Sequence, residues 1–171
     1  MASIQTYSRK FRKHTLDVLD AQLDRPTKLL KTAMASTERN NAVLDCLIIG
    51  GGPAGLSVAT ALARQLYQVV LFDGGKYGND RATHMHNVAT WDHHPPSEFR
   101  QAARKNILER YNTVHFEDTE VESVERTSTG HFEAKDAGGR TWIGKKLVLA
   151  TGSRAVFPDI TGYADCWGTG M

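Results

Sequence analysis

Cysteine is scarce in this chain: its 171 residues include two, Cys46 and Cys166, which are far apart and form no C-x-x-C pair. This argues against a disulfide framework and favours a reduced, cytoplasmic compartment. A strong excess of charge of either sign is also lacking, since the formal net charge is +2. With no broad basic stripe, we expect no nucleic-acid partner. No apolar run approaches the roughly 20 residues that span a bilayer, so we expect no membrane partner.

The first part of the chain differs in composition from the rest. Residues 1–33 hold seven lysines and arginines against three aspartates, and apolar residues recur at roughly helical spacing, at Phe11, Leu16, Leu19 and Leu23. An amphipathic mitochondrial transit segment is one interpretation, but the three aspartates count against it because transit peptides are poor in acid. We therefore expect residues 1–41 to be a weakly helical or disordered extension. Met34 resembles a second translation start.

The most informative run is residues 43–55, where an apolar segment leads into Gly-Gly-Gly-Pro-Ala-Gly. Gly50 allows a sharp turn out of a strand, Gly52 allows the backbone to approach a pyrophosphate, and Gly55 allows a helix to pack close to the strand. A proline costs little in the first helical turn, where its missing N–H has no intrahelical partner. Amides at the helix start face phosphates with the positive end of the helix dipole. This pattern predicts a nucleotide site at Gly50, Gly51, Gly52, Pro53, Ala54 and Gly55.

An acidic residue follows at the distance that a ribose-binding carboxylate requires. A helix-compatible segment covers residues 56–66, and a second apolar run, 68–72, ends at Asp73, roughly 20 residues beyond the glycines. Its carboxylate can accept hydrogen bonds from ribose hydroxyls and would repel a 2′-phosphate. The expected nucleotide is therefore FAD or NAD, not NADP. A glycine turn in another α/β protein is the alternative, which the strand–turn–helix context disfavours.

Histidines gather in the next segment. Residues 82–96 contain four, His84, His86, His93 and His94. His-x-His and His-His spacings bind zinc or copper when other ligands converge, but no cysteine joins them. We expect no metal site and interpret the segment as a loop along a cofactor or substrate. A helix is predicted over residues 98–110, with Ser97 as its N-cap.

Strand patterns dominate the remainder. Strands are expected at residues 114–116, 119–126, 131–135, 140–143 and 146–150, with a glycine pair at 138–139 as a hairpin turn. In one of them Val121 and Val124 either face opposite sides or are shifted by a bulge. A dehydrogenase Rossmann fold would alternate helices and strands here. The order predicts an α/β, Rossmann-like FAD-binding domain over residues 42–154, with a parallel sheet, helices and a β-meander, incomplete at its C-terminus.

These motifs resemble a known family. The glycine turn, Asp73 and Ala150-Thr151-Gly152 resemble the FAD domain of class II pyridine nucleotide-disulfide oxidoreductases, the thioredoxin reductases in particular. Residues 84–93 and 162–168 are more specifically similar to gliotoxin-oxidoreductase-type dithiol oxidases of fungal secondary metabolism. The resemblance covers about residues 43–168. It implies that Gly52, Pro53, Ala54 and Gly55 hold the pyrophosphate and Asp73 the ribose. It further implies cofactor contacts at Gly74, Asn87, Val121, Ala150, Thr151 and Gly152.

The resemblance also implies an activity that this sequence does not encode in full. In the family, FAD passes electrons between NADPH and a C-x-x-C, which exchanges with a small disulfide or dithiol, or with thioredoxin; the family proteins are homodimers. The family's C-x-x-C follows the segment matching residues 166–168, whereas this chain stops at Met171. Residues 155–171 therefore correspond to the start of a linker to an NADPH domain that is absent here. No catalytic residue is assigned.

Three hypotheses follow. The first is the FAD-binding portion of a thioredoxin-reductase-like oxidoreductase, inactive alone. The second is a non-catalytic nucleotide-binding or partner-binding protein that retains the fold. The third is a compact NAD-binding enzyme unrelated to thiol chemistry.

Overall fold

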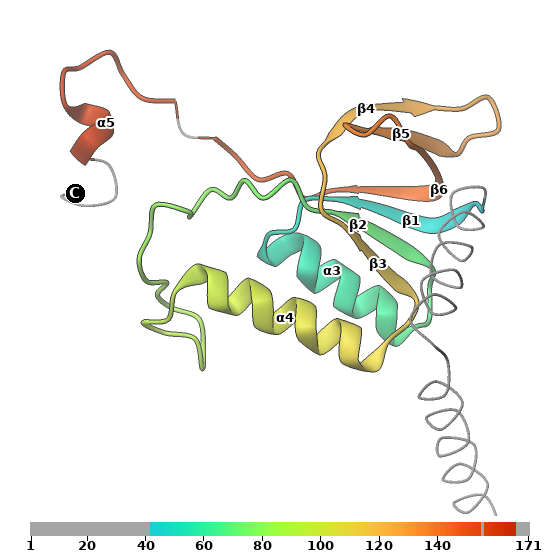
Figure 1. Cartoon of the computed structure of the whole chain (residues 1–171), viewed down its shortest axis with the longest axis horizontal. Helices are drawn as coiled ribbons and strands as arrows, with labels where there is room; N and C mark the ends of the chain where they lie inside the picture. The colour runs from blue at the N-terminus through green and yellow to red at the C-terminus, as the bar shows by residue number, and fades with distance from the viewer. Residues whose placement is uncertain (1–41, 155, 167–171) are drawn as a thin grey trace, which may run out of the picture. The chain divides into compact units, whose positions relative to one another are not determined.

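The computed structural model describes residues 42–154 and 156–166 (Figure 1). The extension expected over residues 1–41 lies outside these residues, as does part of the linker expected over 155–171. The elements of the described part are, in order, β1 (Leu44–Ile49), α3 (Pro53–Arg64), β2 (Val69–Phe72), α4 (Pro96–Arg110), β3 (Val114–Glu117), β4 (Val121–Arg126), β5 (Phe132–Asp136), β6 (Thr141–Leu149) and α5 (Tyr163–Cys166). Within the described residues, no helix combines the length and apolar character needed to cross a bilayer.

A single mixed sheet organises these elements, in the order β3-β2-β1-β6-β5-β4. Strands β3, β2, β1 and the second half of β6 are parallel, whereas β6, β5 and β4 form an antiparallel meander. Parallel strands are usually covered on both faces, which explains the continuous apolar run of β2, all four of whose residues are buried.

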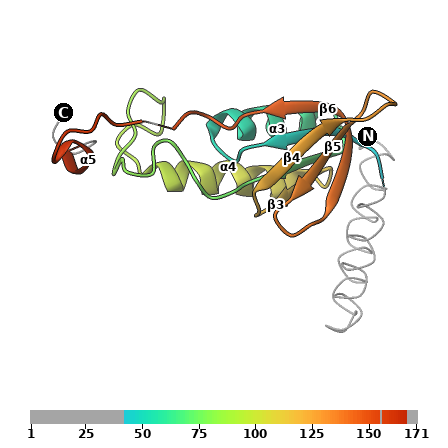
Figure 2. The same ribbon diagram turned by 90° about the horizontal axis from the view of Figure 1, so that it is seen from above.

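The two faces of the parallel strands are covered by different layers (Figure 1). Helices α3 and α4 cover one face, where Ile48, Ala59 and Ile107 belong to one core cluster. The meander covers the other, and seen from above, the β4–β5 ribbon lies across the parallel strands (Figure 2). There Trp142 packs edge-on against Phe72, with ring centroids 5.6 Å apart. The predicted α/β, Rossmann-like fold with a parallel sheet, helices and a β-meander is confirmed.

One long strand replaces two that the sequence predicts separately. Residues 140–143 and 146–150 were expected as different strands, but β6 runs unbroken from Thr141 to Leu149. Gly144 is the point of exchange, because it pairs with Phe132 on β5 and with Leu44 on β1. A Cβ at Gly144 would lie 2.6 Å from Leu47 Cγ. Position 144 therefore requires glycine, because Leu47 of β1 packs against it too closely for a side chain. Gly144 does not end the strand.

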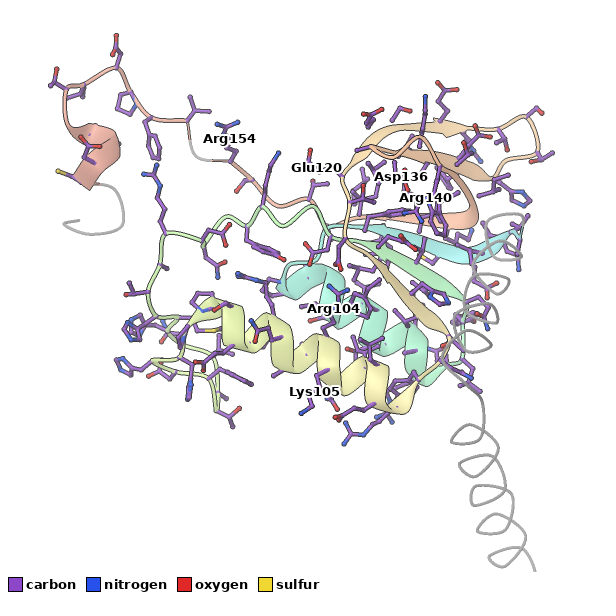
Figure 3. The ribbon with its side chains drawn as sticks, viewed as in Figure 1. Arg104, Lys105, Glu120, Asp136, Arg140 and Arg154 are labelled. Carbon is purple, nitrogen blue, oxygen red and sulfur yellow. The ribbon has the colours of Figure 1, made fainter. Side chains whose placement is uncertain are left out.

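The predicted hairpin at residues 138–139 is present and is held by a buried carboxylate, Asp136 (Figure 3). It accepts hydrogen bonds from the Gly138 and Arg140 amides, at 2.9 and 3.0 Å, and from Arg140 Nε and Trp142 Nε1 at 2.9 and 3.0 Å. Burial raises the pKa of this carboxyl, but the bonds from Trp142 and Arg140 outweigh burial and lower the pKa below its usual value.

The structure decides two local features, the register of β4 and the start of α4. The register of β4 against β5 shifts between Val121 and Ser123, so the bulge alternative is correct. Helix α4 begins at Pro96 with Pro95 as its N-cap, and no side chain caps it. The prediction of Ser97 as N-cap is wrong, because a proline is already suited to the first helical position.

Candidate functional site

The glycine turn is compressed against the end of β6. Gly50 follows β1 with φ +118°, and a Cβ there would lie 2.2 Å from the Ala150 carbonyl oxygen. A Cβ at Gly55 would lie 1.9 Å from the Gly50 carbonyl oxygen. Both positions therefore exclude any side chain, and the first turn of α3 sits directly on the turn that leaves β1.

Gly52 is free of such crowding. A Cβ built on Gly52 meets no protein atom within 4 Å, and its backbone is extended, with φ −75° and ψ −178°. It is the N-cap of α3, and no side chain caps the helix. The first helical bond runs from the Leu56 amide to the Gly52 carbonyl, 3.0 Å, so the amides of Ala54 and Gly55 precede the helical ladder. An open face therefore lies beside helix-start donors, which is the arrangement that binds a phosphate.

Asp73 lies at the end of β2, against the same turn. A Cβ on Gly51 would fall 2.1 Å from the carboxylate carbon of Asp73, so glycine there lets the carboxylate approach the backbone. Its Oδ1 accepts the Gly75 amide at 3.0 Å. The Tyr77 hydroxyl lies 2.9 and 2.8 Å from the two carboxylate oxygens. Burial, and then the bond to Asp73 and its charge, raise the pKa of Tyr77 to about 12. Tyr77 therefore remains a neutral donor that orients the carboxylate.

A pocket of about 250 Å³ opens beside this carboxylate. Its lining comes from the glycine turn, the end of β2, the following loop and α4, at Gly51, Leu56, Asp73, Tyr77, Ser97, Arg100, Gln101 and Arg104. Ligand pockets for drug-sized molecules usually measure about 300–1,000 Å³. The volume therefore suits one part of a dinucleotide and not the whole of it.

Two arginines on α4 contribute the positive charge of this pocket. The Arg100 guanidinium stacks on the Tyr77 ring, 3.6 Å from its centroid, and bonds to Asp80 at 3.3 Å. Arg104 forms a two-pronged ion pair with Asp118. Figure 3 shows Arg104 on the side of α4 toward the sheet, while Lys105 points the other way. Sequence reasoning missed both arginines, although their i, i+4 spacing puts them on one helix face.

The segment after β6 completes the turn on its other side. The Ala150 amide donates to the Ile49 carbonyl, 2.8 Å away, which holds the strand end beside the glycines. Thr151 and Gly152 are exposed, and Gly152 has φ +69° with open space around its Cβ position. Among the described residues no strand pairs with the outer edge of β6 over residues 145–149, and Leu149 is 67% exposed.

The remaining predicted residues lie in other segments. Gly74 lies under Glu120, whose Cγ would be 2.8 Å from a Cβ at Gly74. Val121 begins β4 and packs on the meander side of the sheet. Asn87 lies in the loop before α4, where its amide donates to Asp92. The roles of Gly74, Asn87 and Val121 toward a cofactor remain predictions.

The cysteines form no dithiol. No disulfide joins them: Cys46 is buried in β1 and Cys166 is exposed in α5. Burial, and then the neighbouring charge of Asp45, raise the pKa of the Cys46 thiol, which makes it a poor nucleophile at neutral pH.

The geometry fits the ADP portion of a dinucleotide. The uncapped start of α3 and the open backbone face at Gly52 directly follow Gly51, which lines the pocket together with the Asp73 carboxylate. The helix start and the open face match what a pyrophosphate requires, and the carboxylate matches what a ribose requires.

Comparison with known proteins agrees with this geometry. Residues 44–170 match the pyridine nucleotide-disulphide oxidoreductase family. The chain is 50% identical over 126 residues to thioredoxin reductase aclD of Aspergillus oryzae, covering 73% of this chain and 40% of that relative. It is 45% identical over 128 residues to thioredoxin reductase sirT of Leptosphaeria maculans, covering 74% of this chain and 39% of the relative. Among solved structures, an oxidoreductase from Agrobacterium tumefaciens superposes with a TM-score of 0.71 at 36% identity, covering 75% of this chain and 43% of the other.

The chain thus spans about 40% of the length of the curated relatives it matches. Membership of the family implies FAD and NADPH as the cofactors of its complete proteins. The fold, the glycine turn and the sequence matches agree: this chain belongs to the pyridine nucleotide-disulphide oxidoreductase family and has the fold of a thioredoxin-reductase-like FAD-binding domain.

Proposed function

We propose that this chain binds the ADP portion of FAD and has no disulfide or dithiol turnover by itself. The observation that carries the proposal is Gly52, where an open backbone face adjoins the uncapped start of α3. The amides of Ala54 and Gly55 would hold the pyrophosphate, and Asp73, oriented by Tyr77, would hold the ribose. Gly50, Gly51 and Ala150 would shape the turn around them.

The wider role proposed is that of the FAD-binding portion of an oxidoreductase acting on disulfide or dithiol groups. When bound, FAD supplies two-electron transfer between a nicotinamide and a disulfide. For the complete protein, NADPH as electron donor, a small disulfide or thioredoxin as substrate and a homodimer are the proposed partners. The names of the relatives, thioredoxin reductases, support this substrate class.

Inactivity of the chain alone is supported by its cysteines. Thiol–disulfide exchange needs an accessible thiolate and, for the family's reaction, a second thiol close to it. Cys46 is buried with a raised pKa, and Cys166 is exposed in a different element. The two therefore do not offer the required pair.

The second candidate is a non-catalytic nucleotide-binding or partner-binding protein that retains the fold. It is favoured by the size of the pocket, about 250 Å³, which suits a nucleoside portion better than a complete flavin. A compact NAD-binding enzyme is the third candidate, because Asp73 suits the ribose of NAD as well as that of FAD.

A visible absorption spectrum of the purified chain, recorded after incubation with FAD and gel filtration, tests the proposal. A retained flavin band supports it. Binding of ADP-ribose in calorimetry without a flavin band supports the second candidate, and turnover with a nicotinamide alone supports the third. If neither FAD nor ADP-ribose binds, the nucleotide site is wrong.

A further inference from the structure

The loop before α4 holds a second group of chemically competent side chains. Its two arms are joined by backbone hydrogen bonds of 2.9 Å, from the Met85 amide to the His94 carbonyl and from the His93 amide to the Met85 carbonyl. This closure brings residues 86 and 93 side by side although seven positions separate them. The histidine rings of these residues meet edge to face, with centroids 4.7 Å apart.

Asp92 lies near both rings. Its Oδ1 is 3.7 Å from His86 Nδ1, and its Oδ2 is 3.5 Å from His93 Nε2. One ligand atom from each of the three residues lies within 4.8 Å of the other two. The Asn87 amide donates to Asp92 Oδ1 at 2.9 Å, which fixes the carboxylate.

These separations are close to those of a metal centre. Two ligand atoms on a tetrahedral zinc, each bonded at about 2.0–2.1 Å, lie roughly 3.3–3.4 Å apart. The two distances from Asp92 exceed this by a few tenths of an ångström and run to its two different oxygens. Binding of one ion therefore requires rotation of the exposed side chains, which draws three ligand atoms that now lie within 4.8 Å of one another to the tetrahedral spacing.

The backbone of this loop is held in an unusual conformation. Asn87, Thr90 and His93 all have positive φ, between 61° and 67°. Non-glycine residues adopt this region rarely, and such strain gathers at ligand clamps. The strained residues include one member of the group and the residue whose amide fixes Asp92.

We propose that His86, Asp92 and His93 form a binding site for a divalent first-row transition ion, with zinc as the reference ion. Imidazole suits zinc, copper, iron and nickel, and two imidazoles with one carboxylate form known zinc sites, whereas magnesium and calcium prefer oxygen ligands throughout. All three side chains are exposed, so water completes the coordination. The ion would clamp the two arms of the loop and, through Asp92, fix the backbone at Asn87.

The other histidines of the loop are outside this site. His84 Nδ1 is 3.0 Å from the Thr83 hydroxyl, and His94 Nδ1 is 3.3 Å from Glu98 at the start of α4. Sequence spacing alone made His-x-His, which pairs His84 with His86, the apparent motif. The backbone closure of the loop instead brings His86 beside His93. The third ligand is an aspartate and not a cysteine.

Titration calorimetry of the purified 171-residue chain with zinc chloride, after treatment with a chelator, tests the proposal. We expect one zinc per chain. His86→Gln, Asp92→Asn and His93→Asn should each weaken zinc binding at least tenfold, because loss of an outer-shell partner alone typically costs 10–100-fold. Asparagine at position 93 tolerates positive φ. His84→Gln, in the same loop, is the matched control and should bind zinc as the unmutated chain does.

Far-ultraviolet circular dichroism checks that each variant is folded. We expect all of them to fold, because the substituted side chains are exposed. Copper should bind more tightly than zinc, and magnesium should produce no heat. No zinc binding by the unmutated chain would overturn the proposal and leave only histidine–aspartate ion pairs. Equal zinc affinity in His86→Gln, or a loss of affinity in His84→Gln as large as that in His86→Gln, would also overturn it. The outcome does not depend on nucleotide binding.

Discussion

Replacement of Gly52 by valine should weaken nucleotide binding sharply while leaving the fold intact. The Cβ position at Gly52 is open and its backbone is extended, so valine meets no clash, and the free energy of unfolding should fall by only about 1 kcal/mol, the scale of an unfavourable N-cap residue. The valine methyl groups would occupy the space in which a phosphate approaches the amides of Ala54 and Gly55. Hydrogen bonds to a charged group contribute about 1.5–3 kcal/mol each.

Loss of two such bonds costs about 3–6 kcal/mol, which corresponds to a fall in affinity of a hundredfold or more. Isothermal titration calorimetry with FAD and ADP-ribose measures this loss, and thermal unfolding measures stability. Equal affinity of Gly52→Val and the unmutated chain would refute the placement of the pyrophosphate.

The adjacent glycine provides a matched control. A methyl group at Gly51 would lie 2.1 Å from the Asp73 carboxylate carbon, so Gly51→Ala must displace that carboxylate. We expect Gly51→Ala to lower both stability and nucleotide affinity strongly, in contrast to Gly52→Val, which should lower affinity with only a small loss of stability. If both variants unfold at the same reduced temperature, Gly52 has a structural role that its open surroundings do not indicate.

Three further outcomes are expected. Asp73→Ala should weaken FAD or NAD binding by about 1–3 kcal/mol and narrow the discrimination against a 2′-phosphate; calorimetric preference for NADP over NAD in the unmutated chain would contradict this role. Asp136→Asn should lower the free energy of unfolding by roughly 3 kcal/mol at pH 7, because it leaves buried donors such as Trp142 Nε1 without a charged acceptor. The folded-state pKa of Asp136 is lowered, so its contribution to the free energy of unfolding is fully present above the ordinary aspartate pKa of about 3.9. That contribution is lost as pH falls through the lower folded-state pKa. Urea titrations should therefore show the difference in stability between the unmutated chain and Asp136→Asn shrinking in acid. The chain alone should not catalyse NADPH-dependent reduction of a small aromatic disulfide, with or without FAD; turnover that disappears in Cys46→Ser or Cys166→Ser would contradict the assignment.

The nucleotide turn was predictable because its logic is local. Glycine at residues 50, 52 and 55, an apolar strand before them and Asp73 at the next strand end each follow from backbone geometry within some thirty positions. The structure agrees at Gly50 and Gly55, where a Cβ would collide with a carbonyl oxygen, and at Gly52, where it would meet nothing. The alternation of strand patterns after residue 114 likewise predicted the meander.

Long-range geometry decided the rest. Gly144 resembles a strand break in the sequence, but it lies inside β6 because two different strands pair with it and Leu47 packs beneath it. Ser97 resembles an N-cap, yet the preceding proline begins the helix.

Sequence by itself thus determined the family, the fold class and the position of the phosphate turn, since periodicity and glycine spacing act over short stretches of chain. Only the tertiary structure showed that Tyr77 orients Asp73, that Arg100 and Arg104 line its pocket, and that His86 meets His93 across Asp92. Each of these groupings joins residues through a loop closure or a helix docked on a sheet. Such contacts depend on where whole elements pack, which no local pattern of residue types specifies.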